Sequence, residues 1–244
     1  MNPNGLRGRK ARREREYVSV SCLFLSVSLL CPFDVHPQEQ KTGSPGTVAL
    51  VLRIQICDAT GLDAETFRDV EREVDSIYAA VGPEIRWIEN CEGQPIEDIR
   101  HAAARVYILG QIPRGFLCRC LHFNKTNRVM GFTPTDPGGK PGSVVYVSRD
   151  SVQAIASDYH SKPITELHLS RALGRVVAHE LAHRFLEQKE HTRRGILRGG
   201  FSRRELIDPK RGHLAFDGVQ AATILRWVRS KDSLAVASAS SAAH

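Results

Sequence analysis

The stretch His179-Glu180-Leu181-Ala182-His183 has the form H-E-x-x-H, which on a helix predicts a zinc site with its own base. Residues four apart on an α-helix lie one above the other, with Cβ atoms roughly 5–6 Å apart, so both imidazoles can converge on one ion. Glu180 is poorly aligned for a third ligand, but it can reach a water on the open metal position and accept its proton. The alternative is a solvated helix with two surface histidines.

The residues before the motif favour a helix that packs against a core. Apolar side chains recur there at helical spacing, at Leu169, Leu173, Val176, Val177 and Leu181. His179 and His183 lie at the edge of this stripe, so their imidazoles should point inward or into a cleft, where they need partners. We therefore expect the motif on a helix that is built into a site.

A catalytic zinc ion is held by three protein groups and a water, so a third ligand should follow the motif. His191 is the natural choice, because it comes after the point where the chain must leave the helix and curl back. Glu205 is the alternative, since one class of zincins takes a glutamate from a later helix, and His213 is more remote. The room for such a helix is small, because the chain there contains Gly199, Gly200 and Pro209.

The segment from 179 to 198 reads H-E-x-x-H-x7-H-x3-G-I-L-R, which resembles the zinc signature of secreted bacterial metzincin-like proteins. The resemblance implies that Glu180 is the base and that Gly195-Ile196 forms a turn beneath the metal. The zinc ligands that it implies are His179, His183 and His191. The expected activity is that of a metzincin-like zinc metallopeptidase with a peptide or protein substrate.

The chain departs from this family pattern in two places. Leu197 stands where the family has the methionine of its turn, and exchanges between leucine and methionine usually cost under about 1.5 kcal/mol. Leu186-Glu187 stands near the point where metzincins have a glycine that ends the helix. The route of the chain into His191 should therefore differ locally from that of the family.

The patterns outside the motif and the resemblance together predict an α+β fold of the zincin or metzincin type. Its sheet should be twisted, mixed and mostly parallel, with an active-site helix and a C-terminal helix that Asp217 caps. A helix that begins at Asp63 and ends at Gly82-Pro83 should join two parallel strands. The expected strands are 47–56, 85–88, 104–109, 129–133 and 143–148.

The segment 143–148 has a second interpretation that bears on substrate binding. Zincins place an edge strand beside the cleft, where an extended substrate can pair with it as an added strand. This segment is a candidate for that strand, and an ordinary strand inside the sheet is an equally good interpretation. The segment 201–211 is basic and is expected to be turn-like.

The chain is expected to have three parts, of which the first is a signal peptide with a linker at 1–45. Basic residues precede an apolar run at 17–30, which is short for a membrane-spanning helix of about 20 residues. A metzincin-like catalytic domain should follow at 46–230 and a disordered Ala/Ser-rich tail at 231–244. We therefore expect an exported protein, periplasmic or extracellular, without a stable membrane span after signal removal; an uncleaved membrane anchor is the alternative.

Four cysteines would remain after removal of the signal: Cys57, Cys91, Cys118 and Cys120. In an oxidising compartment they should form one or two disulfides, and free thiols are the alternative. Cys57 and Cys91 each end a strand of the same strand–helix–strand unit, so they could lie close together.

Composition is that of an ordinary globular protein, with 41% hydrophobic and 25% charged residues. The net charge of +7 is concentrated in the first sixteen residues, and no nucleic-acid motif is present, so we expect no nucleic-acid partner. Five further basic residues could rim a cleft for acidic substrates or belong to a solvated loop: Arg193, Arg194, Arg198, Arg203 and Arg204.

The sequence thus favours zinc-dependent hydrolysis of peptide bonds, with Zn²⁺ as cofactor and Glu180 as general base. The alternative is a catalytically inactive, zinc-stabilised secreted protein with a binding or envelope role. The presence of Glu180 argues against this alternative, because a structural site needs no base and favours four closed ligands. Tyr146 is a conceivable donor to the oxyanion of the reaction.

Overall fold

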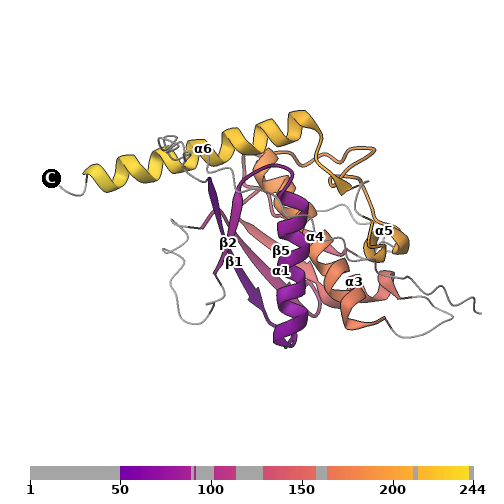
Figure 1. Ribbon diagram of the computed structural model, residues 1–244. Coiled ribbons are helices and arrows are strands. Elements are labelled where there is room, and N and C mark those ends of the chain that lie inside the picture. The colour runs from indigo at the N-terminus through magenta and orange to yellow at the C-terminus, as the bar shows by residue number, and fades with distance from the viewer. Residues whose placement is uncertain are drawn as a thin grey trace, which may run out of the picture. The chain divides into compact units, whose positions relative to one another are not determined.

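The computed structural model describes residues 50–88, 91, 102–113, 129–157, 164–210 and 214–241, all within the unit Thr47–His244. Its strands form one five-stranded sheet in the order β2-β1-β3-β5-β4 (Figure 1). β2, β1, β3 and β5 run parallel to one another, whereas β4 pairs with β5 antiparallel. The strands are β1 (Val51–Asp58), β2 (Glu84–Ile88), β3 (Ala104–Leu109), β4 (Gly131–Phe132) and β5 (Val144–Ser148).

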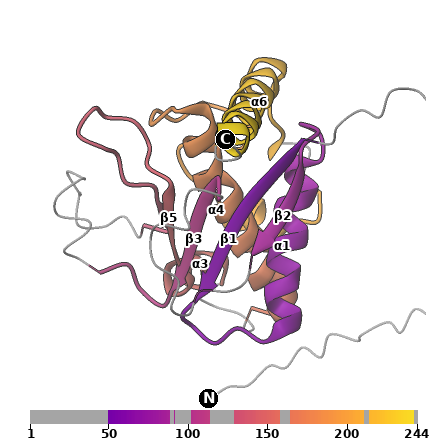
Figure 2. The same ribbon diagram turned by 90° about the vertical axis from the view of Figure 1, so that its left-hand side faces the viewer.

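Alternation along the strands gives the sheet one fully buried face. In β1, Leu52, Ile54 and Ile56 are buried on this face; on the other face Arg53 is exposed, whereas Gln55 and Cys57 are buried. The buried face packs on α1 (Ala64–Tyr78) and α4 (Glu166–Leu186), which lie behind the strands in Figure 2.

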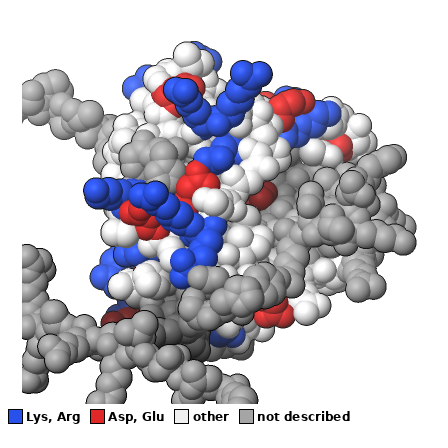
Figure 3. Space-filling model, turned by 90° about the vertical axis from the view of Figure 1, so that its right-hand side faces the viewer, with Lys and Arg blue, Asp and Glu red and all other residues white. Residues whose placement is uncertain are grey.

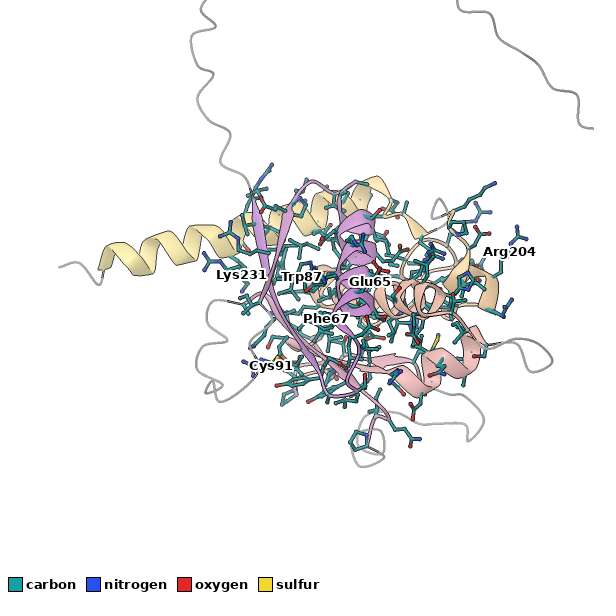
Figure 4. The ribbon with its side chains drawn as sticks, turned by 60° about the horizontal axis from the view of Figure 1, so that its bottom comes forward. Glu65, Phe67, Trp87, Cys91, Arg204 and Lys231 are labelled. Atoms are coloured by element: carbon teal, nitrogen blue, oxygen red, sulfur yellow. A yellow bond between two sulfur atoms is a disulfide. The ribbon has the colours of Figure 1, made fainter. Side chains whose placement is uncertain are left out.

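The first helix forms as its sequence predicts. The side chain of Asp63 accepts hydrogen bonds from the backbone N–H groups of Glu65 (3.0 Å) and Thr66 (2.9 Å), which caps α1. On the side towards β2, the indole N–H of Trp87 donates to Asp75 at 2.9 Å (Figure 4). The parallel pairing of β1 and β2 confirms the predicted strand–helix–strand unit.

α4 is the centre of the molecule and is buried on nearly every side between Leu169 and His183. It contacts β3, β4, β5, α1, α3 (Arg149–Ala156), α5 (Arg203–Ile207) and α6 (Gly218–Ser241). Close packing on α1 depends on Gly174, because a Cβ atom there would lie 2.6 Å from the Cβ of Glu73. The predicted apolar stripe is therefore correct but covers only part of a helix that is enclosed all round.

The predicted fold class is confirmed: a mixed, mostly parallel sheet is combined with the motif helix α4 and the C-terminal helix α6. For the segment 143–148 the sequence left two interpretations open, an edge strand or a strand inside the sheet, and the second is correct. The segment 143–148 forms β5, which lies inside the sheet between β3 and β4. The edge strand on that side is β4, a two-residue strand within the segment 129–133 where a strand was expected.

Two of the helices that the structure describes are absent from the sequence-based prediction. α3 begins where the Ser148 side chain accepts a hydrogen bond from the N–H of Ser151 (3.2 Å). α5 lies in the segment expected to be turn-like, and Ser202 and Glu205 form a capping box at its start. The S-x-x-E spacing of this box was a readable signal, so the expectation of a turn at 201–211 was wrong.

The C-terminal helix begins as predicted, because Asp217 accepts a hydrogen bond from the N–H of Gln220 at 2.8 Å. α6 then continues to Ser241 and projects past β1 and β2 (Figure 1). This differs from the disordered tail expected at 231–244, because alanine has the highest helix propensity and extends the helix. Among the described helices, none has the length and apolarity that a membrane crossing requires.

Cys57 in β1 and Cys91, three residues after the end of β2, form a disulfide with an S–S distance of 2.05 Å (Figure 4). The sequence indicated only that these two cysteines could lie close together. Cys118, Cys120 and residues 1–45 lie outside the described residues, so the expectations for them stay predictions.

Candidate metal centre

The chain reverses sharply at the C-terminal end of α4. The helix ends at Leu186, and Glu187 takes a left-handed conformation with φ of 49°. The N–H of Gln188 then donates to the carbonyl of His183 at 3.2 Å. Glu187 thus adopts the left-handed conformation that a glycine would adopt at the end of the helix in the family pattern. After this reversal the chain returns towards α4 at His191.

Two backbone carbonyls orient the imidazoles of the motif. Nδ1 of His179 lies 2.7 Å from the carbonyl oxygen of Ile196, and Nδ1 of His183 lies 2.6 Å from that of Gln188. Because a carbonyl can only accept, each Nδ1 carries the proton and each Nε2 of the neutral ring has a free lone pair. These two Nε2 atoms face each other at 3.1 Å.

His191 completes the cluster from the opposite side. Its ring stacks on that of His179 with centroids 5.2 Å apart, and lies edge-on to that of His183 at 5.0 Å. The ligand nitrogens of the three side chains all lie within 4.8 Å of one another. His179 and His183 are buried, whereas His191 is exposed, so the cluster opens to solvent on the side of His191.

The turn after His191 supports the cluster. Gly195 has φ of 77°, and a Cβ atom there would lie 2.8 Å from the carbonyl oxygen of Ala215, so glycine is required twice over. The turn brings the Ile196 carbonyl to His179, and the side chains of Ile196 and Leu197 are fully buried. Leu197 thus occupies a buried hydrophobic position. Because leucine and methionine have similar volumes, its presence in place of methionine should leave no cavity.

The donor set fits zinc. Two Zn–N bonds of about 2.0–2.1 Å at a tetrahedral angle separate their nitrogens by about 3.3–3.4 Å, close to the 3.1 Å between the Nε2 atoms. Burial lowers the pKa of all three imidazoles, to about 3 for His179, where His183 adds to the effect. The rings are therefore neutral, which is the form that binds metal, and two facing lone pairs favour a cation between them.

Glu180 lies beside this cluster in a buried position. Burial raises its pKa to about 7, although a hydrogen bond from Thr133 opposes the shift. The Thr133 hydroxyl lies 2.8 Å from Oε2 of Glu180. A carboxyl that changes protonation near neutral pH can both accept and return a proton.

The alternative ligands lie elsewhere or are not described. Glu205 caps α5 and forms an ion pair with Arg198, so its carboxylate is already engaged. His213 lies outside the described residues. Tyr146 alternates with Val145 and Val147, which face the helices, and it stacks on Tyr107, so it points to the other face of the sheet.

Three of the five arginines after the motif are committed to contacts within the protein. Arg198 pairs with Glu205, Arg204 with Asp208, and Arg203 donates to the carbonyl of Ala156. Basic and acidic side chains alternate on the face that carries α5 (Figure 3). These contacts favour the solvated-loop interpretation of the basic residues, and a role in substrate selection stays a prediction.

Sequence reasoning missed the residues that orient the site. The carbonyls of Ile196 and Gln188 carry no side-chain signal, and Thr133 lies 47 residues from Glu180 in the chain. Nothing in the segment around Thr133 distinguishes it from other loop threonines. Its role depends on the pairing of β4 with β5, which a two-residue strand does not reveal.

Comparison with known proteins gives a likeness at the level of solved structures. An archaemetzincin from Methanopyrus kandleri is 16% identical over 73% of this chain and 96% of its own, with a TM-score of 0.47. A zinc-dependent peptidase from Methanocorpusculum labreanum is 14% identical over 70% and 99%, with a TM-score of 0.46. No protein-family model and no curated protein matches the chain. Both TM-scores are below 0.5, so these likenesses say nothing about function.

Proposed function

We propose that this protein is a zinc-dependent peptidase in which His179, His183 and His191 hold the metal and Glu180 is the general base. The observation that carries the proposal is the pair of unprotonated Nε2 atoms that face each other at 3.1 Å, with a third imidazole beside them. Protein atoms fix this arrangement through both Nδ1 positions, as metal-binding histidines require. The metzincin-like signature in residues 179–198 supports the same assignment.

The roles of the side chains follow from their positions. A zinc ion in the site would supply Lewis acidity, which polarises a peptide carbonyl and makes water nucleophilic near neutral pH. Glu180 accepts the proton of the attacking water on a carboxylate oxygen and returns it to the nitrogen of the leaving amine. His191 lies on the exposed side of the cluster, where a substrate enters.

The test combines metal analysis with peptide turnover. The purified protein should contain about one zinc per chain and cleave a library of unstructured peptides, detected by mass spectrometry. Glu180→Gln should retain zinc and lose turnover, since an amide cannot accept the proton. Glu166→Gln is the matched control, because Glu166 is an exposed glutamate in the first turn of the same helix. A zinc-loaded wild-type protein without turnover would support the zinc-stabilised binding protein instead.

The third ligand has its own test. His191→Ala should weaken zinc binding by orders of magnitude, whereas Glu205→Ala should leave it nearly unchanged. Glu205→Ala also removes a capping box, so its cost in stability is expected at about 0.5–2 kcal/mol. Zinc content must therefore be measured per folded molecule. Loss of zinc in Glu205→Ala alone would contradict the assignment of His191.

We also propose that the protein is exported, as the basic and apolar N-terminal segment predicts. The disulfide between Cys57 and Cys91 supports this proposal, because disulfides persist in oxidising compartments. Fractionation of the producing cells, with thiol labelling of each fraction, tests it. Accumulation in the reducing cytoplasm with both thiols free would contradict it.

A further inference from the structure

β4 crosses α4 at the general base. This edge strand pairs antiparallel with β5, where Gly131 lies opposite Val147 and Phe132 opposite Tyr146. α4 and β4 are in contact, and the residues on either side of Phe132 meet the side chain of Glu180. The position of the Glu180 carboxylate is therefore defined by a strand as well as by its own helix.

Gly131 provides the space for this carboxylate. A Cβ atom at position 131 would lie 2.6 Å from Oε1, 2.7 Å from Cγ and 2.9 Å from Cδ of Glu180. Because Cγ is among these atoms, a small movement of the carboxylate alone could not relieve the overlap. Any side chain at position 131 would force Glu180 into another rotamer.

Thr133 provides a directional contact to the same carboxylate. Its hydroxyl oxygen lies 2.8 Å from Oε2 and 3.1 Å from the backbone carbonyl oxygen of Glu180. A hydroxyl has one hydrogen to donate, and the charged acceptor at the shorter distance receives the stronger bond. Oε2 is held in this way, which leaves Oε1 to accept a proton from water.

The backbone around Thr133 holds the hydroxyl in place. A residue before proline is restricted to extended conformations, and Pro134 follows directly. The carbonyl of Pro134 accepts from the N–H of Gly142 at 2.6 Å, which closes the loop between β4 and β5. Threonine is also restricted at χ1 because it is β-branched. These constraints favour one direction for the donor.

We propose that Thr133 is a positioning residue that orients Glu180 for proton transfer, in space that Gly131 leaves open. The inference rests on the proposed peptidase function, since orientation of Oε1 matters only where Glu180 accepts a proton. Within the described part of the chain, Thr133 makes its hydrogen bonds to Glu180 and none to the three histidines, so its removal should leave metal binding intact.

The first experiment compares Thr133→Val with Thr133→Ser in the zinc-loaded protein. Thr133→Val should lower kcat by ten- to a hundredfold, with KM within about twofold of wild type, because orientation affects the chemical step. Thr133→Ser should remain within a few-fold of wild type, since it retains the hydroxyl. Thr135→Val, at an exposed threonine two residues along, is the matched control and should behave as wild type. An unchanged kcat in Thr133→Val would overturn the proposal.

Zinc content and a second substitution separate orientation from simple disruption. Thr133→Val should keep its zinc, and adding it to Glu180→Gln should cause no further loss of residual turnover. Gly131→Ala should retain zinc and lose at least as much kcat as Thr133→Val, whereas Gly218→Ala, where a Cβ atom meets nothing within 4 Å, should match wild type. Loss of zinc in step with kcat would overturn a positioning role.

Crystal structures of the two Thr133 variants test the inference independently of turnover. Glu180 should adopt one rotamer in Thr133→Ser and a different or divided set of rotamers in Thr133→Val. If wild type itself shows no turnover, the proposed function fails, while these structures still decide whether Thr133 orients Glu180. An identical Glu180 rotamer in both variants would overturn the orientation by Thr133.

Discussion

Arg175 and His179 lie one turn apart on α4 and are both buried, but their polar atoms are used in opposite ways. Each nitrogen of the Arg175 guanidinium meets an acceptor of the protein. Nε pairs with Glu73 at 2.9 Å, and the other two donate to the carbonyls of Glu205 (2.5 Å) and Asp208 (2.6 Å). This guanidinium joins α1, α4 and α5 and leaves no nitrogen for a ligand.

The imidazole cluster is satisfied on only one side. Nδ1 of His179 and of His183 donate to the protein, while their Nε2 atoms face each other. Buried polar groups in native structures nearly always have partners, so an arrangement that lacks a donor between two acceptors indicates an added ligand. Burial alone therefore does not identify a ligand site. Buried polar atoms that have no partner within the protein do identify one.

The largest effect should come from zinc at the imidazole cluster. Adding zinc to chelator-treated protein should stabilise the fold by about 4 kcal/mol at a thousandfold excess over Kd, because only the folded state holds the three ligands together. His183→Ala should abolish the rise in Tm, while His168→Ala, on the first turn of the same helix, should retain it. Thermal unfolding with and without zinc measures both. If zinc raised the Tm of His183→Ala as much as that of wild type, the imidazole cluster would not be the metal site.

Arg175→Met should give the reverse profile. Removing the cation leaves the Glu73 carboxylate and two carbonyls buried without it, which should lower the free energy of unfolding by about 3–5 kcal/mol. The zinc stoichiometry of the folded fraction should not change. Adding Glu73→Gln should recover part of the loss, because the buried charge that Arg175 balanced is then removed. Denaturant unfolding measures these free energies. A cost below about 1 kcal/mol for Arg175→Met would show that the contacts of Arg175 do not stabilise the fold.

Glu187, at the end of the same helix, should show a smaller effect. A left-handed conformation costs a residue with a Cβ atom roughly 1–2 kcal/mol, and part of any gain from glycine is offset by unfolded-state entropy. Glu187→Gly should therefore be more stable than Glu187→Ala by about 1 kcal/mol. Both variants lose the exposed ion pair with Lys140, so their difference isolates the backbone. Equal stability of the two would mean that the reversal into His191 carries no strain.

The smallest expected effect is a pH-dependent change in Tm at Asp75, a carboxyl group whose hydrogen-bond partner is the uncharged indole of Trp87. Asp75 lies two residues from Glu73 on α1, and burial raises its pKa although the Trp87 indole donates to it. A raised folded-state pKa means that stability is lost as pH rises from the unfolded value through the folded one. Asp75→Asn keeps an acceptor for the indole, so its Tm relative to wild type should increase between pH 3 and pH 7. A Tm difference independent of pH would contradict this shift.

Several elements could be predicted because their signals are local. Asp63 and Asp217 cap helices through N–H groups within three residues, and the i, i+4 spacing of His179 and His183 puts both rings on one face. The S-x-x-E box of α5 belongs to the same kind of signal and was overlooked. β4 lies within the strand that was expected at 129–133, but nothing in that short segment indicated that it forms an edge of the sheet, so the segment 143–148 was a candidate for the edge as one of two interpretations.

The sequence by itself determined the chemistry of the site: two imidazoles one helical turn apart, a carboxylate beside them, and a third imidazole within reach after the helix ends. These follow from helix geometry and short-range spacing. Only the tertiary structure decided how these groups are oriented. The carbonyl that fixes His179, the strand that meets Glu180 and the carboxylate that neutralises Arg175 lie 17, 47 and 102 residues away in the chain. Such contacts exist only after α1, α4 and the sheet pack together, because no local interaction brings them within hydrogen-bonding distance.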